Sequence, residues 1–296
     1  MAIELAAGDA RAVILPEWGG RLHQLFIPVD GRPEPLLLAP DDPASYAERP
    51  TRGGSFPMAP WPNRVADGRF RWDGRDFALP LDGKPHAIHG RVLSRAWDVT
   101  AEAPRTCELM ARFDEGWPWR GHAWQRFELR PTSLRMELEV RSDGEPFPAG
   151  CGWHPWFRRD AGGATDARLI VPARQRYVLR EQIPTGELAQ PTGEYRLSGD
   201  DPLAGRRLDD CYRGVNGAIR IRWGALTMTM TIDCPEPHVM IYTPPEAVCI
   251  EPQTCAPNAF NLANRGVPGT GFALAAPGEP VRIESTWSWE ATPRSP

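Results

Sequence analysis

The sequence has almost no lysine and lacks the motifs of several common enzyme classes. Lys84 is the one lysine among 34 basic residues, and all the others are arginine. It stands in the turn-like stretch LDGKPH, where we expect it to be solvated. Schiff-base and pyridoxal chemistry needs a desolvated lysine, so the sequence argues against both. Neither GxxxxGKS, GxxxxGKT nor GxGxxG occurs, which leaves no nucleotide-binding motif.

Basic tracts and long apolar runs are missing as well. The net charge is −4 and no basic cluster is present, so nucleic acid is not expected as a partner. No apolar run approaches the roughly 18 residues that cross a bilayer. The first residues, MAIELAAGDARAVILPEWGG, lack the pattern of a signal peptide. We therefore expect a cytoplasmic protein without membrane contact.

The cysteines are scattered and form no CxxC pair. In a chain of 296 residues, this spacing is typical of reduced thiols. A disulfide between Cys249 and Cys255 is the alternative. The six cysteines are Cys107, Cys151, Cys211, Cys234, Cys249 and Cys255.

Apolar and polar residues alternate through much of the sequence. Around Asp73-Gly74, apolar residues at alternate positions lie on both sides of the dipeptide, which is a strong hairpin signal. Long helical stripes are absent, and 33 prolines and 28 glycines suit many turns. The pattern predicts an all-β fold of packed antiparallel sheets. The same period of two recurs at residues 125–140, 218–232 and 281–291.

One domain over residues 1–296 is the simplest organisation, because no low-complexity linker, charge run or internal repeat divides the chain. Residues 41–49 and 258–264 are each expected to form a short helical turn. The polar stretches at residues 158–168 and 181–210 are expected to be surface loops, and long loops of this kind often border a binding site.

A glutamate at the end of an apolar strand raises the first question about function. The strand-like AVCI leads directly into Glu251, and a buried carboxylate is costly unless another group pairs with it or the protein uses it. His154 raises a similar question, because AGCGWHPWFRR places it among aromatic residues. It is either a core histidine or a general acid or base beside a platform on which a sugar ring could stack.

Three further groups of polar residues have both a plain and a functional interpretation. Arg64, in the rigid stretch PWPNR, is either a surface arginine or a clamp for a polar ligand. His86 and His89 have a spacing that could suit a metal, but a metal site needs further ligands. Asp209 and Asp210 are adjacent in a loop, where acidic residues are usually solvated.

Taken together and in order, five stretches resemble the aldose 1-epimerase (galactose mutarotase-like) family. They are APWPNRVADGRF, HAIHG, GWHPWF, LDDCY and CIEPQTCAPNAFN, and the resemblance runs from about residue 12 to about residue 290. It implies a large antiparallel β-sandwich, often called a supersandwich, with an open cleft for a free sugar.

The resemblance also implies a role for individual residues. Glu251 matches the general base of the family and His154 its general acid. Asp209 matches the substrate-binding aspartate of the family, and Asp210 takes that role if the register slips by one. Trp156 stands in HPWF where many relatives have HPYF. The residues implied to bind or shape the substrate pocket are Asn63, Arg64, His89, Trp156 and Asp209.

The implied reaction is mutarotation, in which a reducing sugar opens, rotates about C1–C2 and closes on its other face. One base and one acid suffice, so neither a cofactor nor a metal is expected. The expected partner is a small sugar, and the chain is expected to be a monomer or a homodimer.

Three alternatives stay open at this point. The first is a mutarotase for a hexose with a 6-phosphate or 6-sulfonate, which additional arginines would bind. The second is a non-catalytic carbohydrate-binding module on the same fold. The third is a glycoside hydrolase that uses Glu251 and Asp209 as paired carboxylates. The arginines in loops near the motifs are Arg158, Arg159, Arg206 and Arg207.

Overall fold

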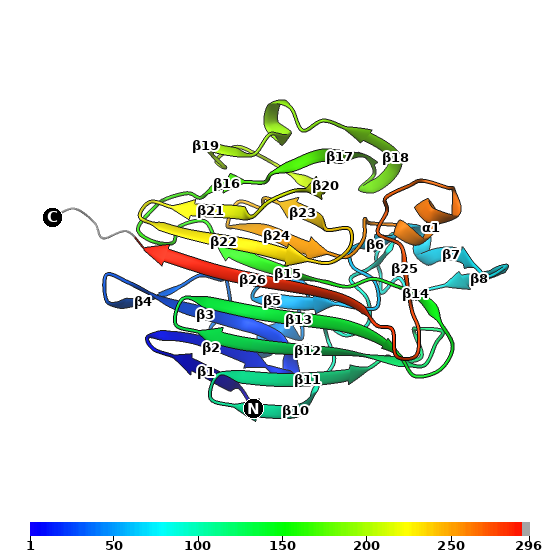
Figure 1. Cartoon of the computed structure of the whole chain (residues 1–296), viewed down its shortest axis with the longest axis horizontal. Helices are drawn as coiled ribbons and strands as arrows, with labels where there is room; N and C mark the ends of the chain where they lie inside the picture. Colours follow the sequence, from blue (N-terminus) through cyan, green and yellow to red (C-terminus); the bar gives the residue numbers. More distant parts are fainter. Residues whose placement is uncertain (292–296) are drawn as a thin grey trace.

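The alternating segments pair into two large antiparallel sheets (Figure 1). The computed structural model describes residues 1–291, without the side chains of residues 200 and 201. Within these residues, the larger sheet has eleven strands. Their order is β1 (Ile3–Ala7), β2 (Ala10–Leu15), β3 (Arg21–Val29), β5 (Ser55–Met58), β15 (Gly152–Arg158), β24 (Ala247–Gln253), β23 (His238–Tyr242), β20 (Asp209–Val215), β17 (Ala173–Arg180) and β18 (Ile183–Ala189), with β4 (Arg32–Pro35) paired to β3.

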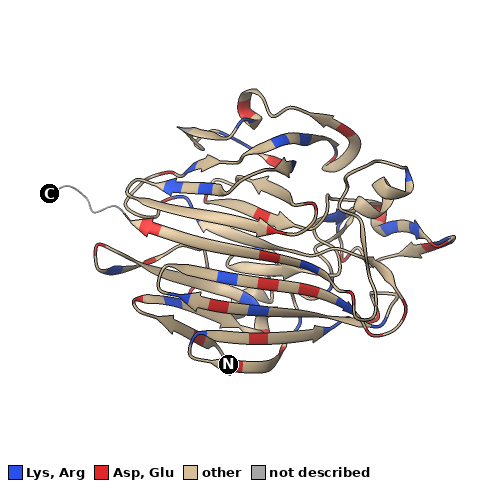
Figure 2. Cartoon of the chain, in the orientation of Figure 1, with Lys and Arg blue, Asp and Glu red and all other residues tan. Residues whose placement is uncertain are grey.

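The second sheet has nine strands in the described part of the chain. Their order is β10 (Asp98–Ala103), β11 (Thr106–Arg112), β12 (Gly121–Arg130), β13 (Ser133–Ser142), β26 (Val281–Ala291), β22 (Leu226–Asp233), β21 (Ile219–Trp223), β16 (Arg168–Ile170) and β19 (Ser198–Pro202). Charged residues of both signs follow one another along β11, β12 and β13 (Figure 2).

Short elements complete the fold. Three two-stranded sheets pair β6 (Arg64–Val65) with β9 (Ala87–Ile88), β7 (Arg69–Trp72) with β8 (Arg75–Ala78), and β14 (Phe147–Ala149) with β25 (Ala273–Ala275). Residues 1–291 contain one α-helix, α1 (Ala259–Asn264). The 3₁₀ turns are η1 (Pro16–Trp18), η2 (Pro43–Tyr46), η3 (Ala66–Gly68) and η4 (Gly193–Tyr195). The all-β prediction is confirmed.

The predicted hairpin is present. A two-residue turn at Asp73 and Gly74 joins β7 to β8, and both residues have positive φ, 49° and 72°. This is the backbone region of a type I′ turn, which aspartate and glycine tolerate. The alternating segments at residues 125–140 and 218–232 also form hairpins, β12–β13 and β21–β22.

One hydrophobic core fills the space between the two large sheets. It includes Leu5 and Ile250 of the larger sheet and Leu109 and Trp287 of the nine-stranded sheet, all fully buried. Because side chains alternate along a strand, each inward residue has neighbours on the outer face. On β24, Ile250 faces the core, so Glu251 faces the outer side of the larger sheet.

The same alternation places the second catalytic candidate on that outer face. On β15, Trp153 and Phe157 belong to the central core, whereas His154 and Trp156 point the other way. Trp156 belongs to a smaller apolar cluster on this side, together with Phe56 and other residues of neighbouring strands. The outer face of the larger sheet therefore has an apolar floor beside its polar residues.

Predictions for the shorter segments had mixed outcomes. The helical turns at residues 41–49 and 258–264 are confirmed as η2 and α1, and residues 158–168 link β15 to β16. The prediction of one loop over residues 181–210 is wrong, because the segment contains β18, η4 and β19. β18 is an edge strand with mostly half-exposed side chains, so it lacks the alternation that marks a strand in the sequence.

Two expectations about disulfides and membranes can also be compared with the structure. All six cysteines are free thiols, and the alternative disulfide between Cys249 and Cys255 is not formed. Among residues 1–291, none of the helices has the length and apolar composition of a membrane span.

Candidate active site

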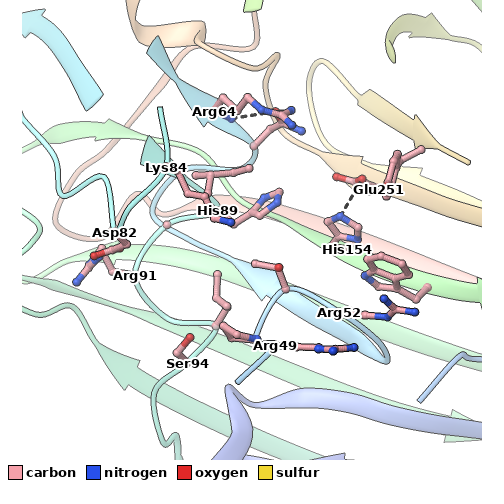
Figure 3. A pocket seen from close by; sticks show the side chains of 18 of the residues that line it. Arg49, Arg52, Arg64, Asp82, Lys84, His89, Arg91, Ser94, His154 and Glu251 are labelled. Atoms are coloured by element: carbon pink, nitrogen blue, oxygen red, sulfur yellow. Dashed lines mark hydrogen bonds and ion pairs between the residues drawn. The ribbon is translucent and has the colours of Figure 1, made fainter. Parts of the chain in front are cut away.

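All seven candidate residues border one cleft on the outer face of the larger sheet (Figure 3). The cleft has a volume of about 1110 Å³ and is also bordered by residues in the segments 47–52 and 82–95. The structure thus brings together side chains that the sequence separates widely. The seven are Asn63, Arg64, His89, His154, Trp156, Asp209 and Glu251.

Glu251 and His154 form a contact at the bottom of this cleft. The register that pairs Gly152 with Gln253 and Trp156 with Cys249 on adjacent strands places His154 across from Glu251. Glu251 Oε1 lies 3.1 Å from His154 Nε2. Only 2% of Glu251 and 5% of His154 are exposed.

Burial drives this pair toward its neutral form. Burial raises the pKa of Glu251 well above 4.5, and nearby Asp209 raises it further, against the opposing effects of Arg64 and Gln253. Burial also lowers the pKa of His154, to about 3. Together these shifts favour a protonated Glu251 beside a neutral His154, whereas a general base and a general acid have to be a carboxylate and a histidinium. A single proton transfer across the 3.1 Å contact interconverts the two forms.

Aromatic rings fix the plane of His154. Phe56 stacks on its imidazole with ring centroids 4.7 Å apart, and Trp156 lies nearly parallel to it at 5.5 Å. His89 meets the same ring edge-on at 5.2 Å. Trp156 therefore borders the cleft and also supports His154, a position consistent with the expectation that it shapes the pocket.

Arg64, Asn63 and Asp209 form a polar group beside the pair. Arg64 Nη2 donates to Asp209 Oδ2 at 3.4 Å, and Arg64 Nη1 donates to Asn63 Oδ1 at 3.1 Å. Gln182 also donates to Asp209 Oδ2, at 2.9 Å. Asn63 thus orients Arg64, while Arg64 and Gln182 hold the carboxylate of Asp209.

The structure decides between the two adjacent aspartates. Asp209 borders the cleft, whereas Asp210 accepts a hydrogen bond from Arg176 Nη1 at 3.2 Å. Successive residues of β20 point to opposite faces of the sheet, so both cannot face the cleft. Asp209 is the candidate, and the slipped register is not needed.

The turn that carries His89 depends on the glycine that follows it. His89 has a positive φ of 62°, and its N–H donates to the carbonyl of Asn63 at 2.8 Å. Gly90 has a φ of 75°, and a Cβ there would lie 2.0 Å from Ala59 O. Only glycine fits, which explains the dipeptide His-Gly at this point. Burial lowers the pKa of His89 well below 6.5, so its imidazole is neutral.

His86 does not join His89. Its Nδ1 accepts a hydrogen bond from the N–H of Asp67 at 3.0 Å, away from the residues that border the cleft. Among residues 1–291, no three histidine, cysteine, aspartate or glutamate side chains are grouped to hold a metal ion. The two-histidine metal site considered from the sequence is therefore not formed.

Sequence reasoning missed residues that border the cleft or contact its central pair. Gln253 Nε2 donates to Glu251 Oε2 at 3.2 Å, and the period of two along β24 could have identified it as a neighbour on the same face. Gln182 and Tyr242 border the cleft. No local sequence signal singles out either residue, because strand pairing alone brings Tyr242 beside Asp209.

Basic residues of the cleft walls differ in their partners. Arg52 pairs with Glu246 at 2.9 Å, and Arg91 pairs with Asp82 and Asp114. Among the described residues, no hydrogen-bond or ion-pair partner is found for the side chains of Arg49 and Lys84. The four arginines that the sequence suggested for an anionic sugar border a separate cleft: Arg158, Arg159, Arg206 and Arg207.

Comparison with known proteins places the chain in a family. Residues 1–286 match the family model described as aldose 1-epimerase. The chain is 28% identical over 263 residues to the uncharacterized protein YphB of Escherichia coli K12, covering 84% of this chain and 87% of that protein. It is 24% identical over 197 residues to galactose mutarotase of Bos taurus, covering 62% of this chain and 56% of the relative.

The fold is shared with solved structures as well. The GalM/aldose epimerase homologue from C. elegans matches with a TM-score of 0.84 at 20% identity, covering 99% of each chain. The two-sheet sandwich is thus a galactose mutarotase-like fold. Because the family model spans nearly the whole sequence, this chain belongs to the aldose 1-epimerase family.

Proposed function

We propose that this chain is an aldose 1-epimerase that interconverts the α and β anomers of a reducing sugar. The observation that carries the proposal is the contact between Glu251 and His154 at the bottom of a cleft with polar walls. Mutarotation moves one proton off the C1 hydroxyl and one onto the ring oxygen. Both oxygens are bonded to C1, so one closely spaced acid–base pair can reach both.

The reaction starts from the one-proton pair. Transfer of that proton from Glu251 to His154 gives a carboxylate and an imidazolium, and nearby Arg64 favours the carboxylate. Glu251 then removes the C1 hydroxyl proton while His154 protonates the ring oxygen. The C1–O5 bond breaks, C1 becomes an aldehyde, and rotation about C1–C2 precedes closure by the reverse transfers.

The surrounding polar residues are proposed to hold the ring. Arg64 and neutral His89 supply donors for hydroxyl oxygens, and Asp209 supplies acceptors. Fixing the ring against the pair contributes to rate through orientation. Proton transfer between neutral oxygens needs no Lewis acid, so a chelator should leave the rate unchanged. Activity lost on chelation and restored by zinc would contradict this mechanism.

The test is NMR exchange spectroscopy on a panel of reducing sugars at anomeric equilibrium. We expect exchange faster than in buffer alone for at least one aldohexose or aldopentose. Sugar binding without faster exchange would instead support a non-catalytic carbohydrate-binding module. Release of the aglycone from an aryl glycoside would support a hydrolase.

A second candidate substrate is a hexose that carries an anionic group at C6. The observation that favours it is the pair of cleft cations without partners among the described residues, Arg49 and Lys84. Figure 3 shows them on different sides of the cleft. If this candidate is right, exchange of hexose 6-phosphate exceeds that of the neutral hexose, and Arg49→Gln or Lys84→Gln lowers kcat/KM for the charged sugar alone.

A further inference from the structure

Arg21 is a fully buried arginine that does not border the cleft. Its guanidinium donates three hydrogen bonds, to the carbonyl oxygens of Trp18, Pro50 and Gly53 at 2.9, 2.6 and 2.9 Å. Among the described residues, no carboxylate forms an ion pair with it. Burying an unpaired cation is costly even when it is hydrogen-bonded.

Two of the three hydrogen bonds hold a wall of the cleft. Residues 49–53 lie between η2 and β5, outside any strand or helix, and Pro50, Thr51 and Arg52 border the cleft. Carbonyls in such a segment have no partners in a sheet ladder. The planar guanidinium of Arg21 donates to two of these carbonyls, those of Pro50 and Gly53. These hydrogen bonds connect the wall to β3.

A second connection leads from Arg21 to His154. The guanidinium carbon of Arg21 lies 5.4 Å from the ring centroid of Phe56, and Phe56 stacks on the imidazole of His154 at 4.7 Å. Phe56 is therefore a single ring that contacts both the guanidinium of Arg21 and the imidazole of His154. Tyr46, whose ring centroid lies 3.8 Å from the same carbon, covers the guanidinium.

The charge of Arg21 also acts on His154. The pKa of Arg21 is lowered to about 10 by burial, so the side chain remains cationic at neutral pH. The pKa of His154 is lowered mainly by burial and then by Arg64 and Arg21. The other titratable groups packed around Arg21 and His154 are Glu251, His89, Tyr46 and His23.

We propose that Arg21 is a positioning residue of the epimerase site, which fixes the cleft wall at residues 49–53 and, through Phe56, the imidazole plane of His154. The claim about catalysis rests on the proposed function. The claim about His154 concerns the free protein and can be tested without any sugar.

The test compares Arg21→Met and Arg21→Lys with Arg176→Met. Arg176 is a matched control, because it also stacks on a tyrosine, Tyr195 at 3.6 Å, but does not border the cleft. Far-UV CD and thermal unfolding identify folded variants. The readouts are kcat and KM for anomer exchange, the pH profile, and the NMR resonance of His154 Hε1, which senses the rings stacked on the imidazole.

For folded Arg21→Met, kcat falls by about 10- to 100-fold, as expected when a reacting group is misplaced. KM rises because the wall at residues 49–53 loosens, the acid limb of the pH profile moves to higher pH, and the His154 resonance shifts. Arg21→Lys keeps the positive charge but loses the planar guanidinium that binds the carbonyls of the wall. Its pH profile therefore stays near that of the wild type, while KM still rises. Arg176→Met changes none of these readouts.

Wild-type values of kcat, KM and the His154 resonance in folded Arg21→Met would overturn the proposal. If this variant does not fold, Arg21→Lys and Phe56→Leu decide, and wild-type kinetics and resonance in both overturn it. Phe56→Leu is expected to lower kcat and shift the resonance. If the wild type accelerates no exchange, the proposed function fails, and the His154 resonance still tests the role of Arg21.

Discussion

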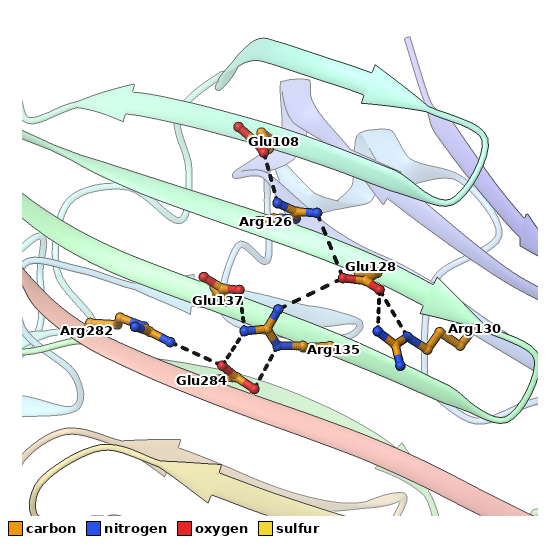
Figure 4. A network of polar contacts seen from close by, with 8 residues as sticks. All are labelled: Glu108, Arg126, Glu128, Arg130, Arg135, Glu137, Arg282 and Glu284. Carbon is orange, nitrogen blue, oxygen red and sulfur yellow. Dashed lines mark hydrogen bonds and ion pairs between the residues drawn. The ribbon is translucent and has the colours of Figure 1, made fainter.

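The outer faces of the two large sheets both carry glutamates, in opposite environments. On the nine-stranded sheet, Glu284 lies 2.7 Å from Arg135 in a network of partly exposed ion pairs (Figure 4). On the larger sheet, Glu251 is 2% exposed and contacts His154. The members of the network are Glu108, Arg126, Glu128, Arg130, Arg135, Glu137, Arg282 and Glu284.

The two glutamates accordingly have opposite pKa shifts. The hydrogen bond from Arg135 lowers the pKa of Glu284 below 4.5, whereas burial raises that of Glu251 well above it. An arginine partner and nearby water keep a carboxylate ionised, while burial keeps it protonated. Glu284 is therefore suited to structure, and Glu251 to proton transfer.

Glu251→Gln tests the comparison most severely. The amide is nearly isosteric and can still bind the C1 hydroxyl, but it cannot accept the proton. We expect exchange to fall by about 10²- to 10⁴-fold, with fold and sugar affinity kept. The matched control, Glu284→Gln, should leave exchange unchanged. Near-normal exchange in Glu251→Gln would make Asp209 the next candidate for the base.

His154→Asn should cost a comparable factor, because the ring oxygen then lacks its acid. In the double variant with Glu251→Gln, the losses should not add, since each residue acts only when the other completes the proton transfer. Exchange rates of both single variants and the double variant measure this. Fully additive losses would mean that the two residues act independently.

The pH dependence of stability should differ in sign between the two faces. Above about pH 4.5 the unfolded chain releases the Glu251 proton while the folded chain keeps it, so this residue lowers stability as pH rises. Glu284 has a lowered pKa, so its contribution is present above about pH 4.5 and is lost as pH falls through the folded pKa. Urea unfolding from pH 4 to 8 measures the free energy of unfolding of each variant. Relative to the wild type, this free energy should rise with pH for Glu251→Gln and fall with pH for Glu284→Gln. The same trend in both variants would contradict the comparison.

The smallest effect is expected within the exposed network. Partly exposed ion pairs typically contribute about 0.2–1 kcal/mol. Because two hydrogen bonds join Arg135 to Glu284, a double-mutant cycle of Arg135→Gln and Glu284→Gln should give a coupling near the upper end of that range. Salt at about 1 M should reduce it, because the screening length is then about 3 Å. A larger coupling that salt does not alter would mean that the charges of this network are shielded from water, as those of the cleft are, and would contradict the comparison.

Much of the fold follows from local sequence. The hairpin at Asp73-Gly74 and the strands of β12 and β13 are predictable because alternation and turn chemistry act over a few residues. β18 was missed because an edge strand need not have an apolar face. The candidate residues came from a resemblance between motifs, since no single motif distinguishes a catalytic side chain from a solvated one.

The sequence by itself determined the alternation of the strands, the residue types of the candidate site and the glycine that the turn after His89 requires. Only the tertiary structure decided that Asp209 rather than Asp210 borders the cleft, that Gln182 reaches it, and that Arg21 supports its wall. It also raised the pKa of Glu251 and lowered that of His154 by burying both side chains. The reason is physical. The packing of the sheets decides which face of a sheet each strand residue occupies, which distant strands touch and which carboxylates lose their water. No local sequence pattern encodes these three outcomes.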